Sequence, residues 1–161
     1  MEELIQELLK FSPKILDIGS PINDNRVQNF ELKYGLLLPD DFKNFMNKHN
    51  GLNLMGTEVL CFDISDINSI ENVYHFEHFE VINPQYTYLV PFSPDGGGNF
   101  YCFDTSKRSQ NGDCQVVFWQ SDYIYSEQDT PDFSSNNFID WVKTVVISWT
   151  LEDYHYDGSK K

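Results

Sequence analysis

Two histidines lie three positions apart in the segment His75-Phe76-Glu77-His78, and Glu80 follows two residues later. Residues i and i+3 share a face of a helix, so these side chains could approach one another as metal ligands. A metal site requires three or four converging ligands, and a fourth group is not identifiable in this sequence. We therefore predict structural or surface roles for His75 and His78, and no metal site.

Asp40 and Asp41 are adjacent, which raises the question of paired carboxylates for acid–base catalysis. Adjacent helical residues point about 100° apart, so the two side chains cannot face one substrate together. Their expected place at a helix start explains them, because carboxylates are stabilised by the positive end of the helix dipole. A hydrolase remains a third hypothesis. It would require a cleft in which two or more carboxylates converge, drawn from Asp95, Asp104, Asp113 and Asp122.

The run Gly96-Gly97-Gly98 lacks the flanks of a phosphate-binding loop, because no Gly-Lys-Ser/Thr follows it and a strand, not a helix, comes next. We interpret it as a hairpin loop that needs positive φ angles.

The three cysteines form no CxxC pair and lie in apolar runs, which predicts buried reduced thiols. We therefore expect no catalytic residue, no cofactor and no enzyme activity. The cysteines are Cys61, Cys102 and Cys114.

The charge is large and unevenly distributed. The formal net charge is −14, and between Lys48 and Lys107 there are eight Asp or Glu residues but no Lys or Arg. Such a segment repels phosphate backbones and attracts cationic partners, which disfavours direct binding of nucleic acid. The alternative interpretation is that the charge only keeps the protein soluble.

The start of the chain and its hydropathy bear on location. Glu2 and Glu3 follow Met1, where a signal peptide would carry positive charge and then an apolar run. No apolar stretch approaches the roughly 18 residues that a membrane span needs. We expect a cytoplasmic protein that does not bind membranes.

Helices are expected at the N-terminal side of the chain. Apolar residues at helical spacing predict a first helix over 2–10. A second helix begins at Asn23 or Asp24 as cap and closes at Gly35. Pro39 lies just inside a third helix, which Asn50-Gly51 stops. The segment 64–83 is expected to hold a short helix and an irregular crossing.

After Gly56 the apolar period changes from 3.6 to 2, which indicates strands. A glycine-rich loop over 93–99 and a turn at Asn111-Gly112-Asp113 close two hairpins, the second with an exposed Lys107-Arg108 tip. Ser134 or Ser135 caps a last helix, and the tail 152–161 frays. The strands are expected at 57–63, 86–92, 100–104 and 115–120, with an edge strand at 122–126.

These elements predict one α+β domain over residues 1–161. Its mainly antiparallel sheet is expected to have about five to six strands, with N- and C-terminal helices packed on it. An isolated edge strand could pair two copies, so a monomer or a weak homodimer is expected.

The order of these motifs resembles the SUKH superfamily, in the branch named for the fungal Smi/Knr cell-wall regulators. The similarity spans roughly residues 27–146 and is carried by several short motifs in series. In the terminal helix two asparagines lengthen the spacing between Ser135 and Phe138 relative to the commonest form. The matching stretches are Leu38-Pro39-Asp40-Asp41-Phe42-Lys43, Asn50-Gly51, Asp95 to Asn99, Tyr101 to Asp104, Val116-Val117 and Ser135 to Val142.

The resemblance implies a protein that binds other proteins. Bacterial relatives look like immunity proteins that neutralise nuclease or other toxins, and fungal relatives look like signalling scaffolds. Our first hypothesis is a cytoplasmic immunity protein that binds a toxin domain, a cationic nuclease, through an acidic and tyrosine-rich surface. The alternative is a regulatory adaptor that docks an endogenous protein. The candidate contact residues are Glu58, Asp63, Asp66, Glu71, Tyr74, Glu77, Glu80, Asp122, Tyr123 and Tyr125.

Overall fold

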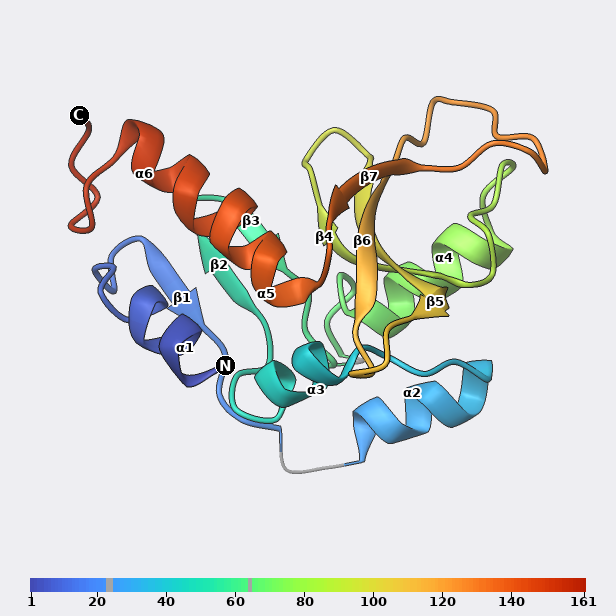
Figure 1. Cartoon of the computed structure of the whole chain (residues 1–161), viewed down its shortest axis with the longest axis horizontal. Helices are drawn as coiled ribbons and strands as arrows, with labels where there is room; N and C mark the ends of the chain where they lie inside the picture. The colour runs from blue at the N-terminus through green and yellow to red at the C-terminus, as the bar shows by residue number, and fades with distance from the viewer. Residues whose placement is uncertain (23–24, 64) are drawn as a thin grey trace.

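The computed structural model describes residues 1–22, 25–63 and 65–161. Within them the strands form two antiparallel sheets, one with the order β1-β2-β3 and one with the order β4-β5-β6-β7 (Figure 1). The predicted α+β class is confirmed, but the strands are divided over two sheets instead of one. Their bounds are Leu16–Ile18 (β1), Leu52–Leu54 (β2), Thr57–Val59 (β3), Leu89–Pro94 (β4), Phe100–Arg108 (β5), Cys114–Trp119 (β6) and Asp132–Ser135 (β7).

A backbone hydrogen bond joins the two sheets where β3 ends beside β4. Leu60, just after β3, donates its N–H to the carbonyl oxygen of Phe92 in β4 at 2.8 Å. The predicted run 57–63 therefore pairs as a strand only over its first half, and then leaves the small sheet to meet the large one. The other predicted strand positions match β4, β5 and β6 with shifted ends.

Helices α1 and α2 precede most of the strands. Helix α1 (Glu2–Leu8) has acids in its first turn and buries one apolar side. Helix α2 (Arg26–Tyr34) ends where predicted, at Gly35, which has a φ of 68°. The cap in the structure is Asn25, and the caps predicted at Asn23 or Asp24 lie outside the described residues.

Helix α3 (Asp40–Met46) begins after Pro39, which is its N-cap and not its first helical residue. The helix ends at Met46, so the predicted stop at Asn50-Gly51 is wrong. Gly51 instead turns the chain into β2, with a φ of 90°. A side chain there would be unfavourable for two reasons: the φ angle is positive, and its Cβ would lie 2.8 Å from the carbonyl oxygen of Val59.

Helix α4 (Ile70–Phe79) fills most of the segment that the sequence left ambiguous. Ser69 caps it, accepting a hydrogen bond from the N–H of Asn72 at 3.3 Å. One side of α4 faces the core, and the other faces away from it. The buried side carries Ile70, Tyr74, Glu77 and His78.

The C-terminal helix is continuous from α5 (Phe138–Trp141) through the π-helical η1 (Val142–Ser148) to α6 (Trp149–Asp153). Its cap is Asn137, whose side chain accepts a hydrogen bond from the N–H of Asp140 at 2.8 Å. The predicted caps were wrong, because Ser134 and Ser135 belong to β7. The edge strand predicted at 122–126 is also wrong, since that segment is a loop and β7 forms the edge.

The core forms where α3, the large sheet and the C-terminal helix meet. The ring of Phe42 lies 4.8 Å from that of Phe103 and 5.1 Å from that of Phe138, measured between centroids. Trp141 packs edge-on against Phe92 at 4.8 Å. These rings bury the apolar area that stabilises the domain.

The tail, predicted to fray, folds back on α1 in the structure. Tyr154 and Lys160 form an antiparallel bridge. Ser12 donates its N–H to the carbonyl oxygen of Tyr156 at 2.8 Å, and the Tyr156 hydroxyl donates to Glu7 at 2.6 Å.

No helix within the described residues has the length and apolar content to cross a membrane.

Candidate protein-binding face

The outer side of α4 carries large apolar side chains together with carboxylates. Phe76 is 51% exposed on the helix, and Ile82, in the turn that follows, is 96% exposed. Ile67, before the helix, is exposed as well. Glu80 ends the helix beside them, so this face combines apolar area with negative charge.

Two hollows of about 610 and 480 Å³ open on this face and are both lined by Phe76, Glu77 and Glu80. We call them together the α4 groove. The first hollow extends to Ile67 and Phe100, and the second to Ile82, Gly98, Trp119 and Ser121. The groove therefore runs between α4 and the loops at one end of the large sheet.

The glycine-rich turn forms the far wall of the groove, and its prediction as a hairpin loop is confirmed. The carboxylate of Asp95 accepts hydrogen bonds from the N–H of Gly97 at 2.7 Å and of Asn99 at 3.0 Å. The side-chain oxygen of Asn99 accepts from the N–H of Ser121 at 3.0 Å. The turn thus joins the β4–β5 and β6–β7 loops and holds the wall in place.

Tyr74, a predicted contact, lies on the buried side of α4. Its hydroxyl donates to the carbonyl oxygen of Thr87 at 2.9 Å, and its ring stacks on His78 with centroids 3.9 Å apart. Burial raises the pKa of Tyr74 to about 12. This side chain supports the helix from below and presents no surface to a partner.

The three predicted glutamates of α4 differ in accessibility. Glu71 forms an ion pair with Lys33 at 2.7 Å. Glu77 is 8% exposed and accepts a hydrogen bond from Gln85 at 3.4 Å, and burial raises its pKa. Glu80 is exposed, 3.5 Å from the ring of His75. Glu80 therefore supplies the open negative charge of the groove.

A second acidic group surrounds a separate cavity of about 140 Å³, lined by Asp17, Glu58 and Asp66. Burial, and then the charge of Asp66, raise the pKa of Glu58. The volume is below the roughly 300 Å³ at which small-molecule sites begin. Three carboxylates converge here, but none belongs to the aspartates from which the hydrolase hypothesis draws its pair, and the cavity is small for a substrate.

Asp63 points elsewhere. It lies 3.3 Å from the guanidinium of Arg26 and accepts hydrogen bonds from the backbone and hydroxyl of Ser65. The bonds from Ser65, followed by the charge of Arg26, hold its pKa below the ordinary value. Its charge is therefore partly balanced locally.

The remaining predicted contacts lie in the loop after β6. Tyr125 stacks on Trp119 with centroids 3.9 Å apart, and its hydroxyl accepts from the N–H of Gln120 at 3.1 Å. Asp122 and Tyr123 are exposed. Because Trp119 lines the α4 groove, the structure brings this loop beside Glu77 and Glu80.

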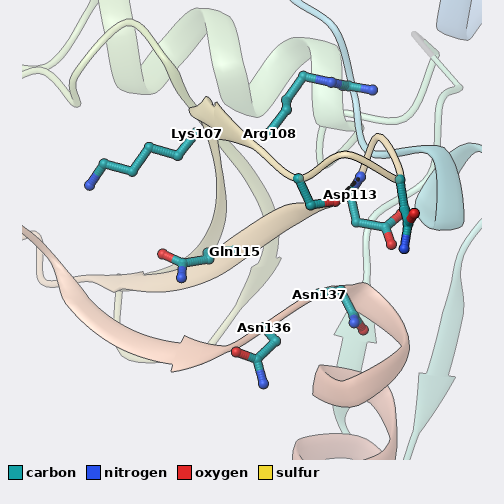
Figure 2. Close-up of a pocket in the computed structure, with 8 residues that line it drawn as sticks. Lys107, Arg108, Asp113, Gln115, Asn136 and Asn137 are labelled. Carbon is teal, nitrogen blue, oxygen red and sulfur yellow. Dashed lines mark hydrogen bonds between the residues drawn. The ribbon is translucent and has the colours of Figure 1, made fainter.

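A polar hollow of about 450 Å³ lies near the other end of β5 (Figure 2). Lys107, Arg108 and Asp113 line it with the amides of Gln115 and Asn136. It holds a single carboxylate, that of Asp113, among the described residues. The paired acids that the hydrolase hypothesis requires are not assembled there.

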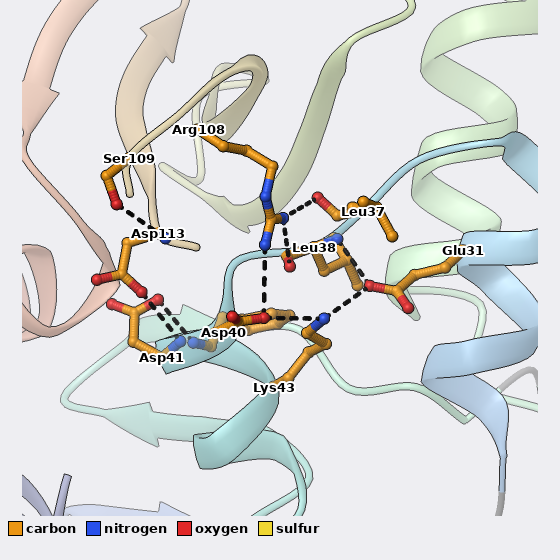
Figure 3. Close-up of polar contacts among 10 residues, drawn as sticks. Glu31, Leu37, Leu38, Asp40, Asp41, Lys43, Arg108, Ser109 and Asp113 are labelled. Atoms are coloured by element: carbon orange, nitrogen blue, oxygen red, sulfur yellow. Dashed lines mark hydrogen bonds and ion pairs between the residues drawn. The ribbon is translucent and has the colours of Figure 1, made fainter. Parts of the chain in front are cut away.

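The adjacent aspartates point apart, as predicted from helical geometry (Figure 3). Asp40 turns outward to Lys43 at 3.0 Å and to Arg108 at 3.4 Å. Asp41 turns inward and accepts hydrogen bonds from the N–H groups of Ile139 at 3.1 Å and Phe42 at 2.7 Å. Its role is to join α3 to the start of α5.

Arg108 corrects the expectation of an exposed hairpin tip. Its guanidinium donates to the carbonyl oxygens of Leu37 and Leu38, both at 2.8 Å, so its side chain is only 24% exposed. The side chain of Lys107 is 69% exposed, as predicted. The Leu38-Pro39-Asp40-Asp41-Phe42 motif is thus a junction between α3, the hairpin and α5.

The residues of this junction that come from α3 and the hairpin lie within a stretch that matches a known protein family. The SMI1/KNR4 family (SUKH-1) matches residues 21–144, which is 124 of the 161 residues. The chain belongs to the SMI1/KNR4 family. Each motif that suggested the resemblance lies inside the matched span, and Leu38 and Phe42 are both fully buried.

One curated relative is similar over most of both chains. It is the uncharacterized protein YnaB of Bacillus subtilis (strain 168), 28% identical over 126 residues, which cover 78% of this chain and 77% of YnaB. The name of YnaB states no activity.

The histidines of this SMI1/KNR4 chain do not share a site. His78 is buried, with its ring nitrogens 2.7 and 3.2 Å from the carbonyl oxygens of Tyr74 and Tyr86, while His75 lies outside near Glu80. Burial lowers the pKa of His78. Over the described ranges, no three His, Cys, Asp or Glu side chains are grouped so that they could hold a metal ion.

The apolar part of the α4 groove was missed by sequence reasoning, although a signal was present. In α4, Phe76 and Phe79 lie on the side opposite Ile70 and Tyr74, so the helix is apolar on two faces. A helix with one apolar stripe packs on one core. The extra aromatic residues form a second, exposed apolar surface on this helix.

Proposed function

We propose that this SMI1/KNR4-family chain is a cytoplasmic immunity protein, which binds a toxin domain and blocks its activity. The proposed toxin domain is a basic nuclease. One observation carries the proposal: an exposed apolar and acidic groove is lined mostly by residues of the segment 49–106, which contains eight acids and no Lys or Arg. Family membership supports binding of a protein, and the charge supports a cationic partner.

The proposed mechanism is occlusion without chemistry. A nuclease domain presents Lys and Arg to bind phosphates, and an acidic protein surface can occupy the same groups. The net charge of −14 would accelerate the encounter over long range, most strongly at low salt. Apolar contacts would then slow dissociation, since exposed charge pairs alone contribute little affinity.

The test is a titration against the protein encoded by the adjacent gene. The full chain is purified and titrated into the C-terminal domain of that protein, and binding and nuclease activity are measured together. We expect one-to-one binding at nanomolar Kd or tighter, with loss of the activity. Absence of binding, with no toxin-like neighbour, would favour the alternative function of a regulatory adaptor for an endogenous protein.

A further inference from the structure

We infer that the α4 groove binds a segment of the partner in which one large apolar side chain is flanked by Lys or Arg. This rests on the proposed function, because it states which part of the toxin domain this face holds. Phe76, Glu77 and Glu80 are central, because they line both hollows of the groove.

The apolar contribution comes from both walls. Phe76 is half exposed and stands between the two hollows, Ile67 and Ile82 lie at their outer ends, and Phe100 and Trp119 come from the sheet side. Each hollow exceeds the volume of any single side chain, so an apolar residue of a partner can enter. Unpartnered aromatic area of this kind is enriched at the centre of protein interfaces.

The charge around the apolar centre has one sign. Among the described residues, no Lys or Arg lines either hollow, whereas Glu77 and Glu80 line both. Asp122 directly follows Ser121 of the far wall, and it is exposed. A partner's apolar residue that enters the groove would therefore lie beside the exposed Glu80 and the largely buried Glu77, and a flanking cation would pair with Glu80.

A second copy of this chain fits the groove poorly. It carries the same net charge of −14, and its exposed apolar residues on α4 lie beside Glu80. Two such faces would bring like charges together on removal from water, which is unfavourable. The charge thus favours a cationic segment of another protein over self-association.

The experiment uses the ¹⁵N-labelled full chain and two synthetic peptides of equal net charge. One peptide has a single leucine between paired lysines, and the other has serine in its place. NMR titration gives both the Kd and the location of binding. We expect the leucine peptide to bind about tenfold more tightly and to shift the amide signals of Phe76, Ile82 and Gly98.

Matched variants distinguish binding in the α4 groove from nonspecific binding to exposed apolar residues. Phe76→Ser should abolish the preference for leucine, whereas Phe133→Ser, at a slightly more exposed aromatic residue on β7, should retain it. Glu80→Gln should weaken both peptides alike. Equal binding of the two peptides, no binding of either, shifts located elsewhere, or equal effects of the two phenylalanine variants would each overturn the inference.

The same variants distinguish this inference from the proposed function. If the toxin domain binds the natural chain and Phe76→Ser with the same Kd, the groove assignment fails while the immunity function stands. If the toxin domain does not bind but the leucine peptide binds through Phe76, the groove stands and the toxin is the wrong partner.

Discussion

The carboxylate of Asp41, in the first turn of α3, accepts a hydrogen bond from the backbone N–H of Ile139, in the first turn of α5, at 3.1 Å. The two residues are 98 positions apart in the chain. One buried side chain therefore satisfies an amide that the start of α5 leaves without an intrahelical partner. Burial and the nearby charge of Asp113 raise the pKa of Asp41 to about 6, although the hydrogen bonds from the backbone of Ile139 and Phe42 oppose the rise.

The first prediction concerns pH. The folded-state pKa of Asp41 lies above its ordinary value of 3.8, so its contribution to stability is fully present below about pH 4 and is lost as pH rises through 6. The loss is about 3 kcal/mol at most. Asp41→Asn cannot titrate, so urea unfolding between pH 4 and 7 should show a smaller loss in this variant. Parallel curves for the two proteins would contradict the prediction, and Asp40→Asn serves as the exposed control.

The second prediction separates the two predicted tyrosine anchors. Tyr74→Phe removes the bond to Thr87 and should lower the free energy of unfolding by about 1 kcal/mol, with no effect on partner Kd. Tyr123→Ala should weaken partner binding and cost less stability, because Tyr123 is half exposed and its ring packs edge-on against Tyr125 in the same loop, with centroids 4.7 Å apart. Urea unfolding and titration with the toxin domain measure both effects. Weaker partner binding by a fully folded Tyr74→Phe would show that Tyr74 reaches the interface after all.

The third prediction tests electrostatic steering at the groove. Reversal of the two open charges, Glu80→Lys with Asp122→Lys, should slow association several-fold at low salt and reduce its salt dependence. Glu3→Lys with Glu152→Lys gives the same change in net charge on exposed sites of α1 and α6. Stopped-flow association rates compare the pairs. An unchanged rate for the groove variant at low salt would rule out steering by this face.

The fourth prediction concerns Gly51. Gly51→Ala should destabilise the fold by about 2 kcal/mol or more, because its φ is positive and its Cβ would approach Val59. Gly35→Ala has a similar φ but no atom within 4 Å of the new Cβ, so about 1 kcal/mol is expected. The difference between the urea midpoints of the two variants measures the cost of the contact between the new Cβ at position 51 and the carbonyl oxygen of Val59. Equal losses would mean that the backbone angle alone requires glycine.

The local signals of the sequence predicted much of the fold. The end of α2 at Gly35 and the Asp95 turn were predictable because each depends on neighbouring residues only. The small sheet was not predicted as a separate sheet because β1 and β2, which pair with the predicted strand at β3, have three residues each, too few for an alternating pattern. The cap of the last helix was misplaced because two serines and two asparagines lie there in series, and the long-range contact between Asp41 and Ile139 that accompanies the cap at Asn137 is not visible in the local sequence.

The sequence indicates only part of the candidate groove, for a similar reason. The charge of the acidic segment follows from composition, so its location near α4 could be anticipated. Which residues of α4 face outward could not, since the helix is apolar on two sides and the period does not choose between them. In the structure Tyr74 and Glu77 are buried, and the exposed aromatic residue of α4 is Phe76 instead of the predicted Tyr74.

The bridge between the tail and α1 has a practical consequence for handling the protein. Because Tyr156 binds Glu7 and Ser12, the last residues lie against the N-terminal helix, at the end of the long axis opposite α4 (Figure 1). A tether attached at Lys161 would therefore hold the molecule with the groove turned toward solution. Surface-based binding measurements can use that attachment without covering the face under study.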